Sequence, residues 1–340
     1  MYNVDERIWR KYIKRNKRRE YFNYRINQIS NTVWRRAYIP VYKRYAGHKV
    51  LSFDETNKMI ANAILDGRPF WAGRYGGTEL GTIVQVINKE LGIKNNLEVL
   101  FERLCNGAGF FPTHISYTED FAEIMLSAYQ HMDLHAVWPQ FMEDYFINWQ
   151  SHNSDLQLTL LGHLEPWNIK RYEDDFEGVR LWTTALKEKR VLIIHPFTDT
   201  IRRQYKERRC HIFDNLMPAD RILPQFELVT LKAVQTIAGE RDNRFTTWFE
   251  ALDYMTEECR KLDFDVAIVG CGAYGFPLSC EIKKMGKTVI HLGGATQLMF
   301  GIMGKRWEEG LKGIANASWT RPGEHEMVRD GNTVEGGCYW

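Results

Sequence analysis

Three short loops in this sequence combine glycines with side chains that could bind a phosphate group. They are residues 74–79 (RYGGTE), 270–275 (GCGAYG) and 293–297 (GGATQ). Glycine lets a ligand approach the backbone closely, N–H groups at the start of a helix favour an anion, and arginine pairs naturally with a diphosphate. We therefore expect a nucleotide or another phosphate ligand at these loops. Tight turns with a purely structural role are the alternative.

Each loop follows a predicted strand and precedes a predicted helix. The strands are the short apolar runs at residues 69–75, 265–269 and 288–292. A fourth strand, at 191–194, ends in His195 and leads into a basic helix over 200–211 that Thr198 or Asp199 could cap. In an open parallel sheet, ligands bind at the carboxyl ends of the strands. We therefore expect these four junctions to meet at one edge of a sheet.

Capping signals and periodicity place most of the other elements. Ser52 and Glu55 have the spacing of a capping box, which starts a helix that Gly67 stops, and Gly286 stops a helix that begins near Pro277. The remaining predictions are a helix from Thr78 to Leu91, a break between two helices at 106–109, a short strand at 136–138, an extended segment at 226–235, an amphipathic helix at 245–262 and an irregular segment at 319–340. The predicted fold class is α/β and Rossmann-like, a mostly parallel sheet with helices on both faces.

The spacing of Gly270, Gly272 and Gly275 also occurs in dinucleotide-binding folds. In those folds an acidic residue about 20 positions further on holds the ribose. Here the next strand ends at His291, and the nearest acid after it is Glu308. An NAD(P)-dependent oxidoreductase is therefore the weaker interpretation of this motif.

Composition describes an ordered protein. The chain has 340 residues, 13% of them aromatic and 26% charged, and its six cysteines form no Cys-x-x-Cys pair. This pattern indicates neither a zinc ribbon nor a disulfide framework and favours a reducing cytosol. His131 and His135 are spaced to share a helix face, but without a third ligand nearby we expect no metal there. No apolar run approaches the roughly 18 residues of a membrane span.

The glycine loops and their flanks resemble a known family. Similarity to the bacterial glycosyltransferases of the GT-D fold, first catalogued as a domain of unknown function, lies in residues 52–56 (SFDET), 74–79 and 272–278 (GAYGFPL). Residues 195–197, 293–297 and 304–307 resemble blocks of related proteins from surface-polysaccharide gene clusters. The likeness spans residues 50–340. It implies a Rossmann-like GT-D domain that binds a UDP-sugar and transfers the sugar to a glycan acceptor.

The loops and the resemblance together assign the site. The expected ligand-binding residues are Arg74, Tyr75, Gly76, Gly77, Thr78, Gly270, Gly272, Ala273, Tyr274, Gly275, Gly293, Gly294, Gln297 and Arg306. Backbone N–H groups and arginine would stabilise charge on the departing diphosphate. An inverting enzyme also needs a base for the acceptor hydroxyl. Glu79 is the best-placed carboxylate, with His195, Asp199 and His291 as alternatives.

The first loop departs from the family pattern. Family members carry an Asp-x-Glu motif there, taken to hold a divalent metal, Mn²⁺ or Mg²⁺, on the diphosphate. Gly77 stands in place of the Asp and Thr78 in place of the middle residue, so only Glu79 matches. A hard cation needs several oxygen ligands. The departure weakens the expectation of a metal, leaves Arg74 or Arg306 to supply its charge, and keeps a non-catalytic nucleotide- or glycan-binding module as an alternative.

Residues 1–49 form a separate basic and aromatic extension. They carry 14 Lys and Arg against three acids, although the whole chain has a net charge of only +2. A helix over residues 1–45 could lie on an anionic membrane surface or pack on the main domain, and the acidic remainder argues against nucleic acid. A membrane-surface anchor would suit a lipid-linked oligosaccharide acceptor, which predicts a cytoplasmic protein at the inner face of the membrane.

Overall fold

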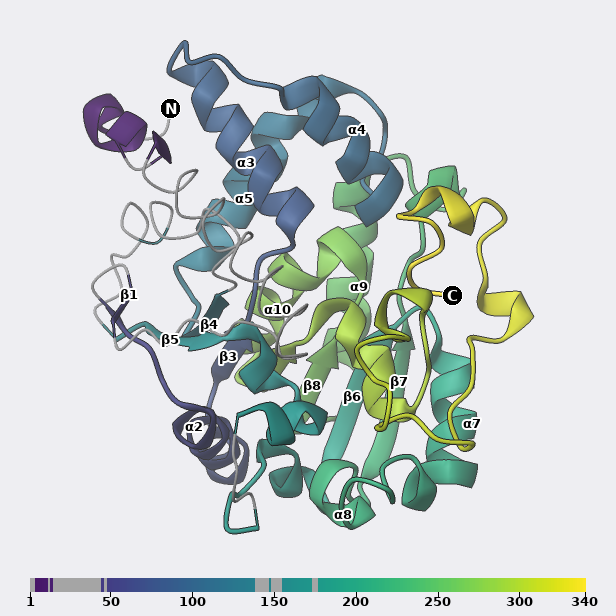
Figure 1. Cartoon of the computed structure of the whole chain (residues 1–340). Coiled ribbons are helices and arrows are strands. Elements are labelled where there is room, and N and C mark those ends of the chain that lie inside the picture. Colours follow the sequence, from purple (N-terminus) through teal and green to yellow (C-terminus); the bar gives the residue numbers. More distant parts are fainter. Residues whose placement is uncertain are drawn as a thin grey trace.

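The computed structural model describes residues 4–11, 13–14, 44–45, 48–137, 147, 155–172 and 177–340 (Figure 1). Its centre is a seven-stranded parallel sheet with the strand order β5-β4-β3-β9-β8-β6-β7. The strands are β3 (Phe70–Gly73), β4 (Leu134–Val137), β5 (Gln157–Leu160), β6 (Arg190–His195), β7 (Glu227–Lys232), β8 (Val266–Val269) and β9 (Thr288–His291). The predicted α/β class with a parallel sheet is confirmed.

Helices cover both faces of the sheet because successive strand residues point to opposite sides. Leu192 and Ile194 belong to one hydrophobic core and Val191 and Ile193 to the other. The first core is covered by α3 (Gly77–Glu90), α4 (Leu97–Ala108), α5 (Thr118–Tyr129), α9 (Trp248–Lys261) and α10 (Gly275–Lys284). The second is covered by α2 (Phe53–Asp66), α7 (Thr198–Arg208), α8 (Ala219–Ile222) and the 3₁₀ helices η4 (Trp182–Leu186) and η8 (Gly293–Phe300).

Several predicted helix boundaries are confirmed in atomic detail. Ser52 Oγ accepts a hydrogen bond from the Glu55 backbone N–H at 3.2 Å, and the Glu55 carboxylate accepts one from the Ser52 N–H at 2.9 Å. Gly67 ends α2 with a left-handed φ of 62°, and Gly286 follows α10 with a φ of 84°. The capping box and both glycine stops therefore define these helices as the sequence indicated.

The break predicted at 106–109 occurs at its last residue, because Asn106 and Gly107 lie inside α4 and Gly109 stops that helix after Ala108 with a φ of 81°. Two other local predictions are wrong. His131 and His135 do not share a helix face, because His131 lies in a turn after α5 and His135 lies in β4. The helix α7 begins at Thr198 without a side-chain cap from Thr198 or Asp199. In each case packing or a distant partner overrode the local signal.

The basic extension is described only in part. Residues 6–11 and 13–14 are helical, and the buried Trp9 donates from Nε1 to Asn88 Oδ1 of α3 at 2.8 Å. This described portion therefore packs on the main domain. Short strands β1 (Arg44–Tyr45) and β2 (His48–Lys49) pair antiparallel at its end. The rest of the predicted membrane-surface helix lies outside the described residues, and no described helix is both long and apolar enough to cross a membrane.

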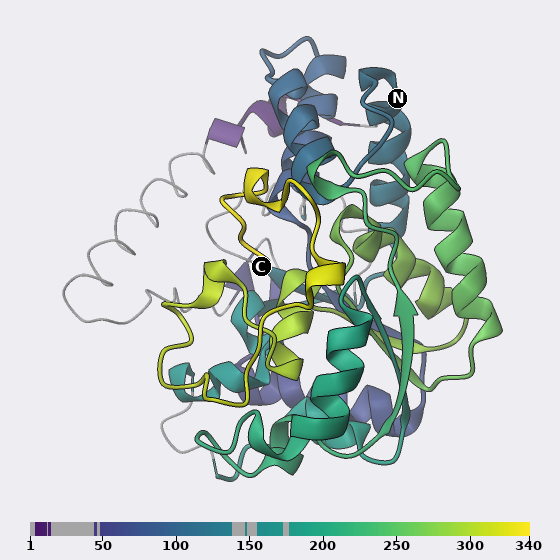
Figure 2. The ribbon, with the colours of Figure 1, turned by 90° about the vertical axis from the view of Figure 1, so that its right-hand side faces the viewer.

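Residues 319–340, which we call the strap, run over the carboxyl edge of the sheet (Figure 2). They contain the 3₁₀ helices η10 (Glu324–Glu326) and η11 (Gly331–Thr333). At one end the Thr320 N–H donates to Gly301 O at 2.9 Å, and at the other the Arg306 N–H donates to Cys338 O at 3.2 Å. The strap, predicted as irregular, is thus hydrogen-bonded to the domain at both ends.

Candidate functional site

A cavity of about 390 Å³ lies at the carboxyl ends of four neighbouring central strands, β3, β9, β8 and β6. All three glycine loops and His195 reach it, as the sequence predicted. The predicted site residues that line it are Arg74, Gly76, Gly77, Thr78, Glu79, His195, Gly270, Gly272, Tyr274, His291, Gly293, Gly294, Gln297 and Arg306. Segments more than 200 residues apart in the chain therefore meet at one place on the sheet edge.

Four predicted site residues lie elsewhere. Tyr75 and Ala273 are each 1% exposed and belong to the core, where Tyr75 stacks on Phe276 at 4.1 Å. Gly275 begins α10, and a Cβ there would overlap the His291 ring. Asp199 lies on α7 outside the cavity, paired with Arg202 at 2.8 Å. These residues are structural in the observed fold, and Asp199 is not placed to act as a base in the cavity.

The protein's own contacts explain several of the loop glycines. Gly293 has a φ of +61°, and a Cβ there would lie 2.5 Å from Arg74 Nη2. Gly272 has a φ of +57°, and its Cβ would lie 2.7 Å from Ala108 O. A side chain at Gly76 would overlap the Glu79 carboxylate. Gly293 and Gly76 thus let Arg74 and Glu79 lie close to the loops that line the cavity, and Gly272 lets its loop approach the end of α4.

Arg74 and Glu79 come from the β3–α3 junction. Arg74 Nη1 donates to Tyr75 O at 3.2 Å, whereas its buried Nε has no hydrogen-bond partner among the described residues. Glu79 lies in the first turn of α3 and is 9% exposed. Burial raises the pKa of Glu79; Arg74 opposes that shift, and the nearby Glu335 adds to it. A buried carboxyl with a raised pKa and an arginine partner is typical of a functional group.

The two histidines of the cavity are held neutral. The Phe197 N–H donates to His195 Nδ1 at 3.0 Å, and burial lowers the pKa of His195 to about 3. Burial together with the charge of Arg74 lowers the pKa of His291 to about 3 as well, and His291 Nδ1 has no described partner. Neither imidazole is therefore a strong base near neutral pH. Both can serve as neutral hydrogen-bonding groups.

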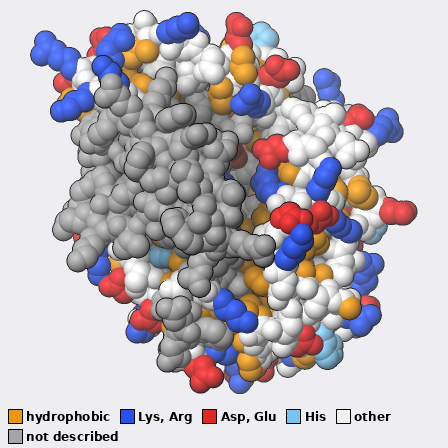
Figure 3. Space-filling view, viewed as in Figure 1, with side chains coloured by type: hydrophobic (Ala, Val, Ile, Leu, Met, Phe, Trp, Pro, Cys, Tyr) orange, Lys and Arg blue, Asp and Glu red, His pale blue; other side chains and the backbone are white. Residues whose placement is uncertain are grey.

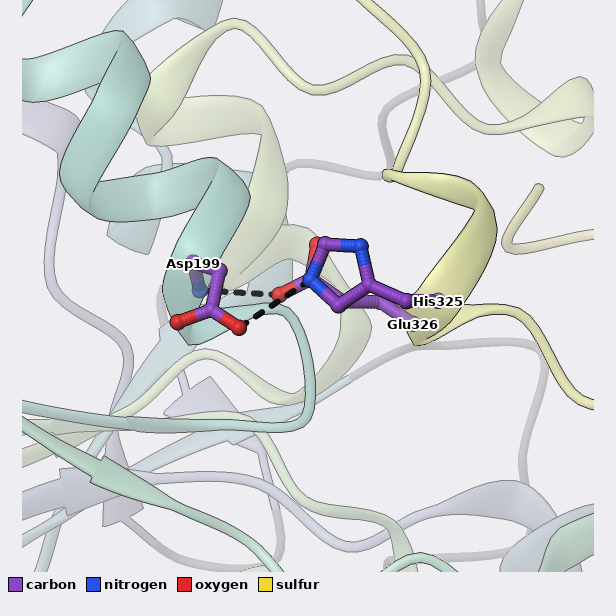
Figure 4. A group of neighbouring side chains, drawn as sticks. All are labelled: Asp199, His325 and Glu326. Carbon is purple, nitrogen blue, oxygen red and sulfur yellow. Dashed lines mark hydrogen bonds and ion pairs between the residues drawn. The ribbon is translucent and has the colours of Figure 1, made fainter.

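A divalent metal does not fit the first loop. Gly77 offers no side-chain ligand, and among the described residues Glu79 belongs to no group of three possible metal ligands. The group that does meet this spacing is Asp199, His325 and Glu326, outside the cavity (Figure 4). Glu326 already accepts hydrogen bonds from the backbone N–H groups of Asp199 and Thr200 and from the Thr200 hydroxyl. This cluster therefore caps α7 and anchors the strap.

Sequence reasoning missed the part of the cavity that α4, the segment after β7 and the strap supply. The missed lining residues include Arg103, Asn106, Thr236, Glu335, Tyr339 and Trp340. Arg306 forms an ion pair with Glu335 and lies 5.1 Å from the Tyr339 ring centroid. Burial raises the pKa of Tyr339, while Arg306 and Arg74 oppose the shift. The only local signal was the glycine pair that follows Glu335, which marks a turn but not its place in the fold.

Comparison of the chain with protein-family models, with curated proteins and with solved structures finds no match.

Proposed function

We propose that this cavity binds a nucleotide-sugar and that the protein is a glycosyltransferase. One observation carries the proposal: three glycine loops and the cations Arg74 and Arg306 converge at the carboxyl ends of four central parallel strands. That edge is where parallel sheets bind phosphorylated ligands, because N–H groups and helix N-termini point outward there. The family resemblance supplies the choice of a UDP-sugar and of the GT-D type.

The chemistry of transfer assigns a role to each charged group. The acceptor hydroxyl oxygen forms a bond to the anomeric carbon, the bond from that carbon to the diphosphate oxygen breaks, and the electron pair leaves with the diphosphate. Arg74, Arg306 and the loop N–H groups stabilise the charge that develops on this leaving group. The acceptor proton passes to Glu79, whose raised pKa makes its ionised form a better base. Because the first loop offers a single carboxylate, we assign the charge stabilisation to these arginines and route no step through a metal.

The acceptor and location follow as parts of the same proposal. We propose a glycan acceptor, carried on a lipid, at the cytoplasmic face of a bacterial membrane in surface-polysaccharide assembly. Figure 3 shows basic and acidic side chains mixed over the described part of one face. In the sequence, the excess of positive charge is concentrated in residues 1–49. Binding to anionic vesicles that disappears when residues 1–45 are deleted would support the membrane contact. No binding at low salt would exclude it.

Calorimetric titration with UDP and UDP-sugars, with and without Mn²⁺, tests the ligand. We expect metal-independent binding that Arg74→Ala weakens by at least about tenfold, since a bidentate arginine contact to a buried diphosphate is among the strong ones. The control is Arg202→Ala, which removes an exposed cation outside the cavity. Binding of no nucleotide would reject the proposal and make the glycine loops structural turns.

A transfer assay on the same variants separates an enzyme from a binding module. We expect Glu79→Gln to keep UDP binding and lose donor hydrolysis and transfer. Metal-dependent UDP binding that disappears in Glu79→Gln would make Glu79 a metal ligand instead of a base. UDP binding by wild type without hydrolysis or transfer would favour the non-catalytic module. Preferential binding of NADH would favour the oxidoreductase.

A further inference from the structure

One acidic side chain that lines the cavity forms an ion pair with an arginine that also lines it. Its charged lining residues are three arginines, Arg74, Arg103 and Arg306, and two glutamates, Glu79 and Glu335. Among the described residues, Arg306 has Glu335 as its ion-pair partner. An arginine that offers its guanidinium to a carboxylate presents the same donors that it would offer to a phosphate. Glu335 therefore lies where a phosphate oxygen would find Arg306.

The backbone at Glu335 is strained. Its φ is +47°, a left-handed value that side-chain-bearing residues rarely adopt, and it is followed by Gly336 at +71° and Gly337 at +85°. Such strain persists only where the surroundings hold it, and it concentrates at ligand clamps and switching segments. Here the Arg306–Glu335 ion pair is one of the contacts that hold the turn. Space is open beside the exposed part of the turn, because nothing lies within 4 Å of a Cβ built on Gly336, and the hydrogen bond from Lys305 Nζ to Gly336 O at 3.1 Å holds it there.

Firm contacts flank this turn on both sides. Upstream, Glu326 binds the start of α7 through the Asp199 N–H at 2.8 Å. Downstream, the Lys305 N–H donates to Trp340 O at 3.1 Å, and Gln297 Nε2 donates to Tyr339 O at 3.1 Å. Between them, Asn106 Nδ2 donates to Thr333 O at 3.2 Å. Val334 and Gly337 are buried, and the Gly337 N–H donates to Val334 O at 2.9 Å. The exposed residues 335–336 can therefore move without releasing the strap once Lys305 Nζ gives up its hydrogen bond to Gly336 O.

Repulsion between a bound phosphate group and the Glu335 carboxylate favours movement of Glu335. Glu335 is close enough to Glu79 to influence its ionisation, so a phosphate group placed among Arg74, Arg306 and Glu79 would also meet the negative charge of Glu335. A diphosphate carries more charge than one carboxylate and can contact both arginines at once. It would therefore compete successfully for Arg306.

We propose that Glu335 is the resident counter-ion of Arg306, and that a diphosphate-bearing ligand displaces the Glu335 side chain and moves residues 335–336 away from the cavity. This inference rests on the proposed phosphate site and adds to it a built-in competitor. It predicts that this part of the strap changes position when the cavity binds a ligand. It also explains why a strained turn is placed at the mouth of the cavity.

Titration with UDP and with inorganic pyrophosphate tests whether a diphosphate displaces Glu335 from Arg306. We expect Glu335→Gln to bind both ligands about two- to fivefold more tightly than wild type, the factor that corresponds to removing one exposed ion pair. The matched control is Glu308→Gln, because Glu308 pairs with Arg321 of the same strap but does not line the cavity. It should bind like wild type. Arg306→Gln should weaken binding and make a further change at Glu335 ineffective.

Hydrogen–deuterium exchange gives a second measurement. UDP should increase hydrogen–deuterium exchange at residues 335–337 in wild type, whereas Glu335→Gln should show fast exchange there without ligand and little change with it. If wild type binds UDP but Glu335→Gln binds it with equal or lower affinity, the displacement of Glu335 from Arg306 is refuted and the proposed function stands. If wild type binds neither UDP nor pyrophosphate, both fall together.

Discussion

Glu326 offers the clearest test of how the strap is held. Its side chain is 5% exposed and lies across the first turn of α7 (Figure 4). The carboxylate accepts from the backbone N–H groups of Asp199 at 2.8 Å and Thr200 at 3.3 Å, from the Thr200 hydroxyl, and from the Gly323 N–H at 3.4 Å. These donors include orphan N–H groups of a helix start, and a negative charge there also interacts favourably with the helix dipole.

The magnitude follows from what each substitution leaves behind. Glu326→Ala removes a helix cap worth about 0.5–2 kcal/mol and leaves partly buried donors without partners, at about 1–3 kcal/mol for such a group. Water can reach part of the site, because Asp199 and His325 beside it are exposed, so we expect a loss of about 3 kcal/mol in the free energy of unfolding. Glu326→Gln keeps one acceptor oxygen and should lose about half of that.

Denaturant unfolding, followed by tryptophan fluorescence, measures these losses. Glu324→Gln is the control, because Glu324 is an exposed acid of the same 3₁₀ helix, and it should change stability by less than about 0.5 kcal/mol. In Glu326→Ala, exchange should also rise at residues 198–201. Unchanged stability of Glu326→Ala would refute the interpretation of this cluster as a cap. A rise in wild-type stability on adding Zn²⁺ or Mn²⁺ that is absent in Glu326→Ala would favour a metal site instead.

Two further predictions concern the cavity. Gly293→Ala should lose about 1–2 kcal/mol of stability because of its left-handed φ. It should also weaken UDP binding, because the new Cβ displaces Arg74. The control is Gly286→Ala, which has a comparable φ of 84° and no atom within 4 Å, so it should lose stability without a change in UDP binding. Equal UDP affinity in both variants would contradict this contact. Burial raises the pKa of Glu79 above 4.5, so the native state holds that proton more tightly and stability falls as pH rises through the raised pKa. Glu79→Gln should therefore be more stable than wild type at pH 7 and lose that advantage below about pH 4; a constant difference across this range would contradict the shift.

Local signals were enough for the centre of the sheet. Apolar runs of strand length predicted β6, β8 and β9 to within a residue or two, because both faces of this sheet are buried and the middle residues of these strands are apolar. Glycine loops at strand ends then placed most of the predicted site residues at the cavity, since parallel strands bring their carboxyl ends to one edge. Periodicity and turn chemistry depend on residues that are close in the sequence, and these elements are formed by such residues.

The missed features all depend on contacts between distant residues. The cap of α7 comes from Glu326, 127 residues after Asp199, and no spacing rule reaches that far. Glu335 enters the cavity because the strap folds back over the sheet edge. His135 lies in β4, where it pairs with Gly73 of β3 and Leu158 of β5, so its spacing from His131 was coincidental. Tertiary packing decided each of these positions.

The strand order has a consequence for how the cavity is assembled. β9 pairs with β3 on one side and with β8 on the other, so the last of the described sheet strands in the sequence lies in the middle of the sheet. Until it inserts, β3 and β8 each present an unpaired edge, and such edges are prone to pair with other chains. Arg74 and Gly293 also come together only at that moment. Ligand affinity should therefore appear only once β9 has paired with both neighbours, and a chain that loses residues 288–291 should aggregate instead of forming a partly active sheet.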